Sequence, residues 1–228
     1  MKQALITALF TALLFSTATA QYFPVDTAKL NSAYRTLEQG IYTEKTEMDF
    51  LEAFPTTWLE FYMTYSYIND ENYDTTMSQK CSEQIIRLFG LSHINESIYC
   101  EKIINLTIGL KESNECTGIF QDCLINYIFN NENLVLNYLS TLKKGHRMQF
   151  WQFCWSSTSE CNRAEDFNEI YIRNKDKYPE EMEISRTAFQ YFYEGINYPN
   201  LLPHKEEEYH RKNYNRNYKY NFDDYSNK

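Results

Sequence analysis

The sequence predicts an all-α protein: a compact bundle of short antiparallel helices, followed by a disordered C-terminal tail. Three observations indicate this fold class. Apolar residues recur at intervals of three and four along most of the chain, which is the period of one helix face. Only 6 glycines and 5 prolines occur among 228 residues, whereas all-β folds usually need more of both for their turns. The connections between apolar stretches are short, which favours antiparallel neighbours.

The N-terminal residues have the composition of a leader peptide. Lys2 precedes an apolar run at 4–15, and residues 18–20 have the small side chains of an A-x-A cleavage site. The run is shorter than the roughly 20 residues that span a bilayer. We therefore expect residues 1–20 to be a cleaved signal peptide. The protein is then exported, to a periplasm or out of the cell, with no membrane insertion after cleavage.

Three helices are expected between residues 26 and 65. Asp26 is a candidate N-cap for a helix that ends at Gly40. Pro55 breaks the second helix and fits the first turn of the third. The polar stretch at 69–76 is a loop. The apolar residues of these three helices are Leu30, Ala33, Tyr34 and Leu37, then Phe50, Leu51 and Phe54, then Trp58, Leu59, Tyr62 and Met63.

Four more helices are expected between residues 77 and 145. The first ends at Gly90, Ser92 is a candidate N-cap of the second, and Gly145 closes the fourth. Their apolar stripes are Met77, Cys81, Ile85, Leu88 and Phe89, then Tyr99, Ile103, Leu106 and Leu110, then Ile119, Phe120, Cys123, Leu124, Tyr127 and Ile128, then Leu134, Val135, Tyr138, Leu139 and Leu142.

The stretch KKGHRMQFWQFCWSS, at 143–157, is the densest aromatic segment of the chain. On a helix with about 100° per residue, its apolar side chains cover a broad arc, and Gln149 and Gln152 share the narrow remaining face. A helix that is apolar over most of its circumference is a buried helix. We therefore predict that 148–155 is the central core helix. The alternatives are an aromatic groove for a sugar or a peptide and, for the basic KKGHR, an anion site instead of a solvated helix boundary.

The last part of the chain divides into helices and a tail. After a loop at 155–160, two stripes are expected, which consist of Phe167, Ile170 and Tyr171, then Met182, Phe189, Phe192 and Tyr193. Residues 204–228 mix charge with Asn and Tyr and have no aliphatic stripe. They bury too little apolar area to offset their ordering entropy. The predicted organisation is therefore a helical domain at 21–203 and a disordered tail at 204–228.

Six cysteines occur after the leader, and an even number in an exported chain favours disulfides. They are Cys81, Cys100, Cys116, Cys123, Cys154 and Cys161. Zinc is the alternative, but no C-x2-C pair is present. The sequence leaves the connectivity open. Neighbour pairing is our interpretation for Cys154 and Cys161, because they flank the loop at 155–160.

Catalytic and metal motifs are weak. His93 and His146 are the histidines outside the tail, and we interpret both as surface or capping residues. Residues 70–74 read D-x-N-x-D, the opening of a calcium loop, but the glycine and the terminal glutamate of such a loop are missing. For an enzyme, Glu52 and Glu60 would be the first candidate carboxylates, because aromatic residues flank them. The sequence predicts no cofactor and no metal.

The net charge of −9 and the pI near 5.0 bear on the partners. An acidic chain is repelled by nucleic acid and by anionic lipid, so neither is expected as a partner. Acidity is compatible with a basic protein partner, whose identity the sequence leaves unknown.

The segments EAFPTTWLEFYMTYSYINDENYD, at 52–74, and KKGHRMQFWQFCWSS resemble those of an uncharacterised group of small exported helical bacterial proteins. The resemblance covers most of the chain after the leader. It implies no activity and no site residue, because the group has none assigned.

The function that the sequence favours is a non-enzymatic exported helical binding protein, such as an inhibitor or an immunity-type protein that blocks a basic toxin or hydrolase. The alternative is an extracytoplasmic hydrolase that acts on cell-wall or glycan material through carboxylates. A third hypothesis is an assembly protein whose Tyr-rich tail folds on a partner.

Overall fold

The computed structural model describes residues 25–65, 75–109, 116–156 and 160–193, and within them all the regular structure is α-helical. The helices are α2 (Thr27–Glu38), α3 (Glu44–Ala53), α4 (Trp58–Tyr65), α5 (Thr75–Phe89), α6 (Glu96–Leu106), α7 (Thr117–Asn130), α8 (Glu132–Thr141), α9 (Lys144–Trp155), α10 (Glu160–Asn174) and α11 (Pro179–Tyr193). The predicted all-α fold is confirmed. The predicted leader, tail and domain boundaries lie outside the described residues.

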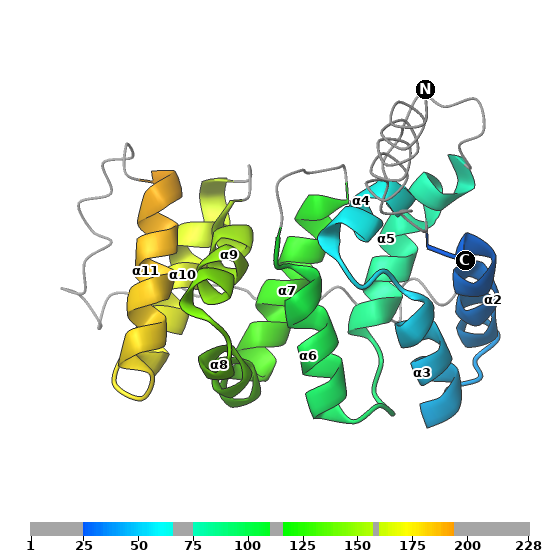
Figure 1. Ribbon diagram of the computed structural model, residues 1–228, viewed down its shortest axis with the longest axis horizontal. Coiled ribbons are helices and arrows are strands. Elements are labelled where there is room, and N and C mark those ends of the chain that lie inside the picture. Colours follow the sequence, from blue (N-terminus) through cyan, green and yellow to red (C-terminus); the bar gives the residue numbers. More distant parts are fainter. Residues whose placement is uncertain (1–24, 66–74, 110–115, 157–159, 194–228) are drawn as a thin grey trace, which may run out of the picture.

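The helices follow one another along the long axis of the molecule, from α2 at one end to α11 at the other (Figure 1). In one layer, α5 packs on α7, α7 on α9 and α9 on α11, while α6 packs on α8. The contacts between α5 and α7 advance along both helices in the same direction. Cys81 is bonded to Cys116, and Phe89, further along α5, packs against Phe120 and Tyr127 of α7. α5 and α7 therefore run parallel, and α6 between them returns the chain.

The ends of the helices explain part of this arrangement. The Asp26 Oδ1 atom accepts a hydrogen bond from the Lys29 N–H at 2.9 Å, so the predicted cap of α2 is confirmed. Gly40 has a φ of 78° and follows the end of α2, as predicted. Two predictions were wrong. Asn95, not Ser92, caps α6, and Gly145 lies in the first turn of α9 instead of closing α8.

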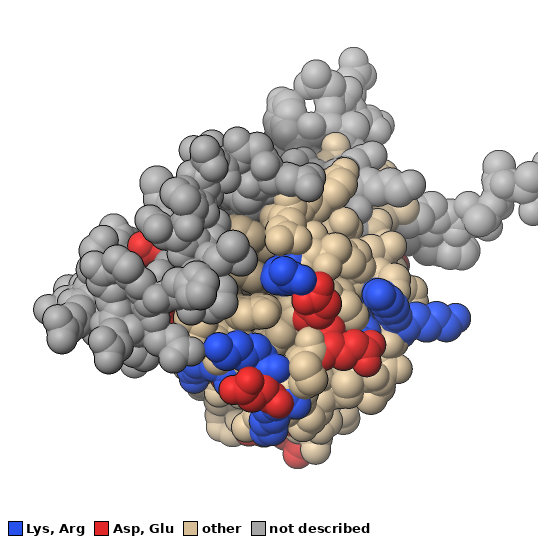
Figure 2. All heavy atoms as spheres, turned by 90° about the vertical axis from the view of Figure 1, so that its left-hand side faces the viewer, with Lys and Arg blue, Asp and Glu red and all other residues tan. Residues whose placement is uncertain are grey.

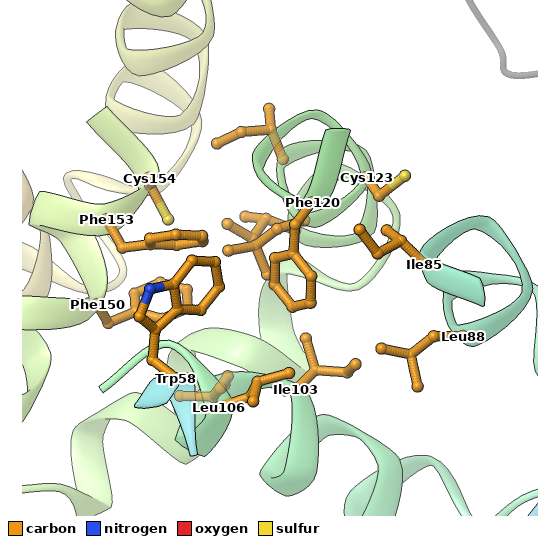
Figure 3. Close-up of a cluster of buried hydrophobic side chains, with 14 of the residues drawn as sticks. Trp58, Ile85, Leu88, Ile103, Leu106, Phe120, Cys123, Phe150, Phe153 and Cys154 are labelled. Carbon is orange, nitrogen blue, oxygen red and sulfur yellow. The ribbon is translucent and has the colours of Figure 1, made fainter. Parts of the chain in front are cut away.

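The core is continuous along the row and is rich in aromatic rings. Trp58 of α4, Phe120 of α7 and Phe153 of α9 converge at its centre (Figure 3). The ring centroids lie 4.8 Å apart for Trp58 and Phe153 and 5.8 Å apart for Phe120 and Phe153. Such tilted and edge-on pairs stabilise a core by more than their buried area alone.

The inward face of α4 differs from the prediction. Trp58 is buried as expected, but Phe61 and Tyr65 are its buried partners. Leu59 and Met63 point outward and are exposed. The segment WLEFYMTY is apolar on nearly every side, so its periodicity does not identify the face that packs on the core.

Candidate functional site

The aromatic stretch at 148–155 forms most of α9, which is buried against α11. Trp151 and Trp155 have no exposed surface, so the prediction of a core helix is confirmed and the aromatic groove is not formed by these rings. The two indoles stack with centroids 5.5 Å apart.

Polar groups on α9 and α11 pair along this interface. The Trp151 Nε1–H donates to Glu181 Oε1 at 2.6 Å, and the Arg147 Nε–H donates to Glu181 Oε2 at 2.6 Å. One turn further, the Trp155 Nε1–H donates to Ser185 Oγ at 3.2 Å. Residues 147, 151 and 155 are spaced by four, as are 181 and 185, so each set lies on one face of its helix.

Burial and the partner groups act in opposite directions on the pKa values of the charged residues at this interface. Burial raises the pKa of Glu181, although the hydrogen bonds from Trp151 and Arg147 favour its carboxylate form. Burial alone would lower the pKa of Arg147, but Glu181 and the exposed Glu180 raise it. The interpretation of KKGHR as a solvated boundary was therefore wrong for Arg147, whose partner lies 34 residues away. Lys143, Lys144 and His146 are exposed.

The two candidate carboxylates, Glu52 and Glu60, both lie near Lys102 of α6. Glu60 Oε2 accepts hydrogen bonds from the Thr56 and Thr57 N–H groups, at 2.6 and 3.1 Å, ahead of the first turn of α4. Burial alone would raise the pKa of Glu60, but a hydrogen bond from the Thr56 hydroxyl, the two backbone hydrogen bonds and Lys102 outweigh it and lower the pKa. Glu60 therefore stays ionised and stabilises a helix start.

Lys102, which the sequence analysis missed, connects α6 to the corner between α3 and α4. Its Nζ–H donates to the Phe54 carbonyl oxygen at 2.8 Å. Burial lowers the pKa of Lys102 to about 8, while Glu60 and Glu52 oppose the shift. A lysine at the last carbonyls of α3 complements the helix dipole. No sequence pattern identifies Lys102, because its stem is apolar and its partner Glu60 lies 42 residues away along the chain.

A second missed contact joins α3 to the start of α6. The buried carboxylate of Glu47 accepts hydrogen bonds from the Ser92 and His93 N–H groups, at 2.8 and 2.7 Å. Its other oxygen lies 2.8 Å from His93 Nδ1. Because a buried carboxylate requires such partners, Glu47 holds the turn before α6. The imidazole of His93 is about half exposed, and its position is fixed by this carboxylate.

The structure joins Cys81 to Cys116, with 6.3 Å between their Cα atoms. This disulfide links α5 to the start of α7. Cys100, Cys123 and Cys154 are buried free thiols, so the expected pairing of Cys154 with its neighbour is not formed. The side chain of Cys161 lies outside the described residues.

A shallow groove of about 370 Å³ lies between α2 and α3. Its lining residues are Lys29, Ser32, Ala33, Thr36, Thr46 and Asp49. No cluster of three or more His, Cys, Asp or Glu side chains suited to a metal occurs in the part of the chain that the structure describes. The D-x-N-x-D segment at 70–74 falls outside that part. No described helix has both the length and the apolar character needed to span a membrane.

The geometry defines an all-α protein whose ionisable core residues join helices to one another. Comparison with protein families, curated proteins and solved structures finds no match. The resemblance to exported helical bacterial proteins stays a prediction.

Proposed function

We propose that this chain is an exported, non-enzymatic binding protein of the inhibitor or immunity type. One observation carries the proposal: Glu60, the carboxylate best placed for catalysis by sequence, has one oxygen occupied by backbone donors at the start of α4. The leader sequence and the Cys81–Cys116 disulfide support export. The net charge of −9 favours a basic partner.

The hydrolase alternative needs different electrostatics. Carboxylate glycosidases require one acid whose pKa is raised, so that it is protonated when it meets the leaving group. The pKa of Glu60 is lowered instead, and Glu52 is exposed to solvent. Glu52 and Glu60 both favour the charged form of Lys102, and Glu60 also stabilises the start of α4. These structural roles favour a binding function over hydrolysis.

The test is partner capture followed by titration. The full chain, exported by its native host and carrying a C-terminal tag, is used to capture proteins from the extracytoplasmic fraction. Each captured protein is purified and titrated by calorimetry. We expect saturable one-to-one binding that weakens as salt rises, and loss of the partner's own activity in the complex.

Turnover of a glycan or cell-wall substrate by the chain would contradict this proposal if Glu60→Gln abolished it. Glu183→Gln is the matched control, because Glu183 is an exposed carboxylate on α11 and lies far along the chain from Glu60.

A further inference from the structure

The Cys81–Cys116 disulfide lies inside the row of helices and not on its surface. Cys81 is 0% and Cys116 2% exposed, so a reductant in solution does not reach either sulfur while α5 stays packed on α7. Thiol–disulfide exchange requires a thiolate to attack one of the two sulfurs directly. The oxidation state of this pair is therefore set while the chain folds, or when this part of the molecule opens.

Two of the three buried free thiols are enclosed by the helices that the disulfide joins. Cys123 of α7 and Ile85 of α5 face one another (Figure 3), as the parallel packing of the two helices requires. Cys100 of α6 lies close to the hydroxyl of Tyr127, and the Tyr127 ring packs on Phe89 of α5. Both thiols are therefore shielded from water by the contacts among α5, α6 and α7.

The third free thiol, Cys154, is enclosed further along the row. It lies on α9, is 0% exposed and is close to Arg163 of α10. Helices α9, α10 and α11 form the far end of the row, where Lys and Arg lie beside Asp and Glu on the surface (Figure 2). One ion pair there joins Arg147 of α9 to Glu180 of α11 at 2.8 Å. The shielding of Cys154 therefore depends on helices outside the segment that the disulfide closes.

A cross-link affects only those open states in which the segment that it closes has lost its structure. The segment from Cys81 to Cys116 contains the second part of α5 and all of α6. When α5 and α6 separate from α7, the bond still holds the two ends of this segment together and so limits the entropy that the open chain gains. When α9 separates from α11, both ends stay in place and the bond has no such effect. The disulfide therefore opposes opening at one part of the row more than at the other.

We propose that the Cys81–Cys116 pair is a redox switch for the part of the molecule formed by α5, α6 and α7. As a disulfide it keeps these helices closed, and as two thiols it lets them open locally, so that Cys100 and Cys123 become accessible. To close the switch, the two thiols give two electrons and two protons to a disulfide-bonded oxidoreductase, whose own disulfide becomes a dithiol, and a dithiol donor reverses this exchange.

Oxidants of this class act outside the cytoplasm, so the switch closes after the chain is exported. The place of closure rests on the proposed export, whereas the local opening rests on the fold alone.

Alkylation of the buried thiols by N-ethylmaleimide measures the opening. The full chain with its disulfide is compared with the same chain reduced in urea and refolded without oxygen, and mass spectrometry of the peptides gives a rate for each cysteine. We expect reduction to speed the alkylation of Cys100 and Cys123 by up to about a thousandfold, the factor that follows from closing a loop with a sequence separation of 35 residues. The rate for Cys154, the internal control, should change little.

The variant Cys81→Ala/Cys116→Ala lacks the bond without any reductant and should show the same pattern as the reduced chain. Met182→Ala is the matched control, because it removes a side chain of α11 that is 1% exposed and should speed the alkylation of Cys154 more than that of the other two thiols. Circular dichroism checks that each chain is folded.

Equal acceleration of all three thiols on reduction, or no acceleration, would overturn the inference, because the bond would then act on global unfolding or on no opening at all. None of these rates depends on a partner, so such a result leaves the proposed binding function standing.

Discussion

At the scale of single residues, buried charge fixes how α9 and α11 fit together. Glu181 is 2% exposed and accepts hydrogen bonds from both Arg147 and Trp151. A carboxylate and a guanidinium lose the free energy of hydration when they are buried. Their mutual attraction and hydrogen bonds offset this loss only when the partners are well placed. The energetic importance of the pair therefore lies in the cost of removing one member.

The first prediction concerns that cost. Glu181→Ala should lower the free energy of unfolding by about 3 kcal/mol, because it leaves the buried Arg147 guanidinium without its inner partner. Urea unfolding followed by circular dichroism measures the loss. Glu183→Ala, on the same helix, removes the exposed partner of Arg186 and should cost less than about 1 kcal/mol. Equal losses for the two variants would contradict the assignment.

At the scale of helices, local signals were predictable and distant contacts were not. Asp26 caps α2 as expected, because its cap bond spans three residues. The burial of α9 followed from its apolar circumference. In contrast, the outward face of α4 was missed. Apolar residues lie on nearly every side of this helix, so packing against the neighbouring helices, and not the sequence pattern, decides which side is buried. The pairing of Arg147 with Glu181 was missed for a related reason: it depends on α9 and α11 meeting in space.

The same limit applied to the candidate site. Glu60 and Glu52 were identified as carboxylates beside aromatic residues, but their shared neighbour Lys102 lies on another helix. Six cysteines indicated disulfides, yet fifteen pairings of six cysteines are compatible with the sequence. The choice of Cys81 with Cys116 follows from the parallel packing of α5 on α7.

The second prediction concerns this link between α5 and α7. The disulfide spans a sequence separation of 35 residues. In the chain-entropy model, closing a loop of that size lowers the conformational entropy of the unfolded chain and so stabilises the folded state by about 4 kcal/mol. Reduction with dithiothreitol should therefore lower the thermal midpoint of the full chain, measured by circular dichroism. The Cys81→Ala/Cys116→Ala variant is the control, since dithiothreitol should not change its midpoint. An unchanged midpoint for the reduced natural chain would argue against the link.

At the scale of the whole molecule, the row of helices buries many groups that are neutral at pH 7 and ionise in alkali. Burial raises the pKa of Cys100 to about 11 and that of Cys123 to about 12. Burial likewise raises the pKa values of Cys154, Tyr65 and Tyr99 well above their ordinary ranges. These groups are spread over several helices, so their titration acts on the fold as a whole.

The third prediction follows from the sign of these shifts. Unfolded thiols lose their protons near pH 9, whereas Cys100 and Cys123 keep theirs to about pH 11 and 12 in the folded protein. Within that window the folded state binds more protons, so the free energy of unfolding falls as pH rises, by up to roughly 1.4 kcal/mol per pH unit for each group. The stabilisation is complete below pH 9. The pKa of Lys102 is lowered to about 8, so this group raises the free energy of unfolding as pH rises from 8 toward the ordinary pKa of lysine. Its effect is smaller than the summed effect of the several buried thiols and tyrosines.

Urea unfolding at intervals from pH 7 to pH 11 measures this dependence. We expect a plateau to about pH 9 and then a steep fall. Cys123→Ala removes one of the titrating thiols, so its curve should fall less steeply above pH 9 even though the substitution itself lowers stability at every pH. A profile that stays flat to pH 11, or an equal slope for Cys123→Ala, would show that these thiols ionise as readily in the folded protein as in the unfolded chain, and so that water reaches them between the helices.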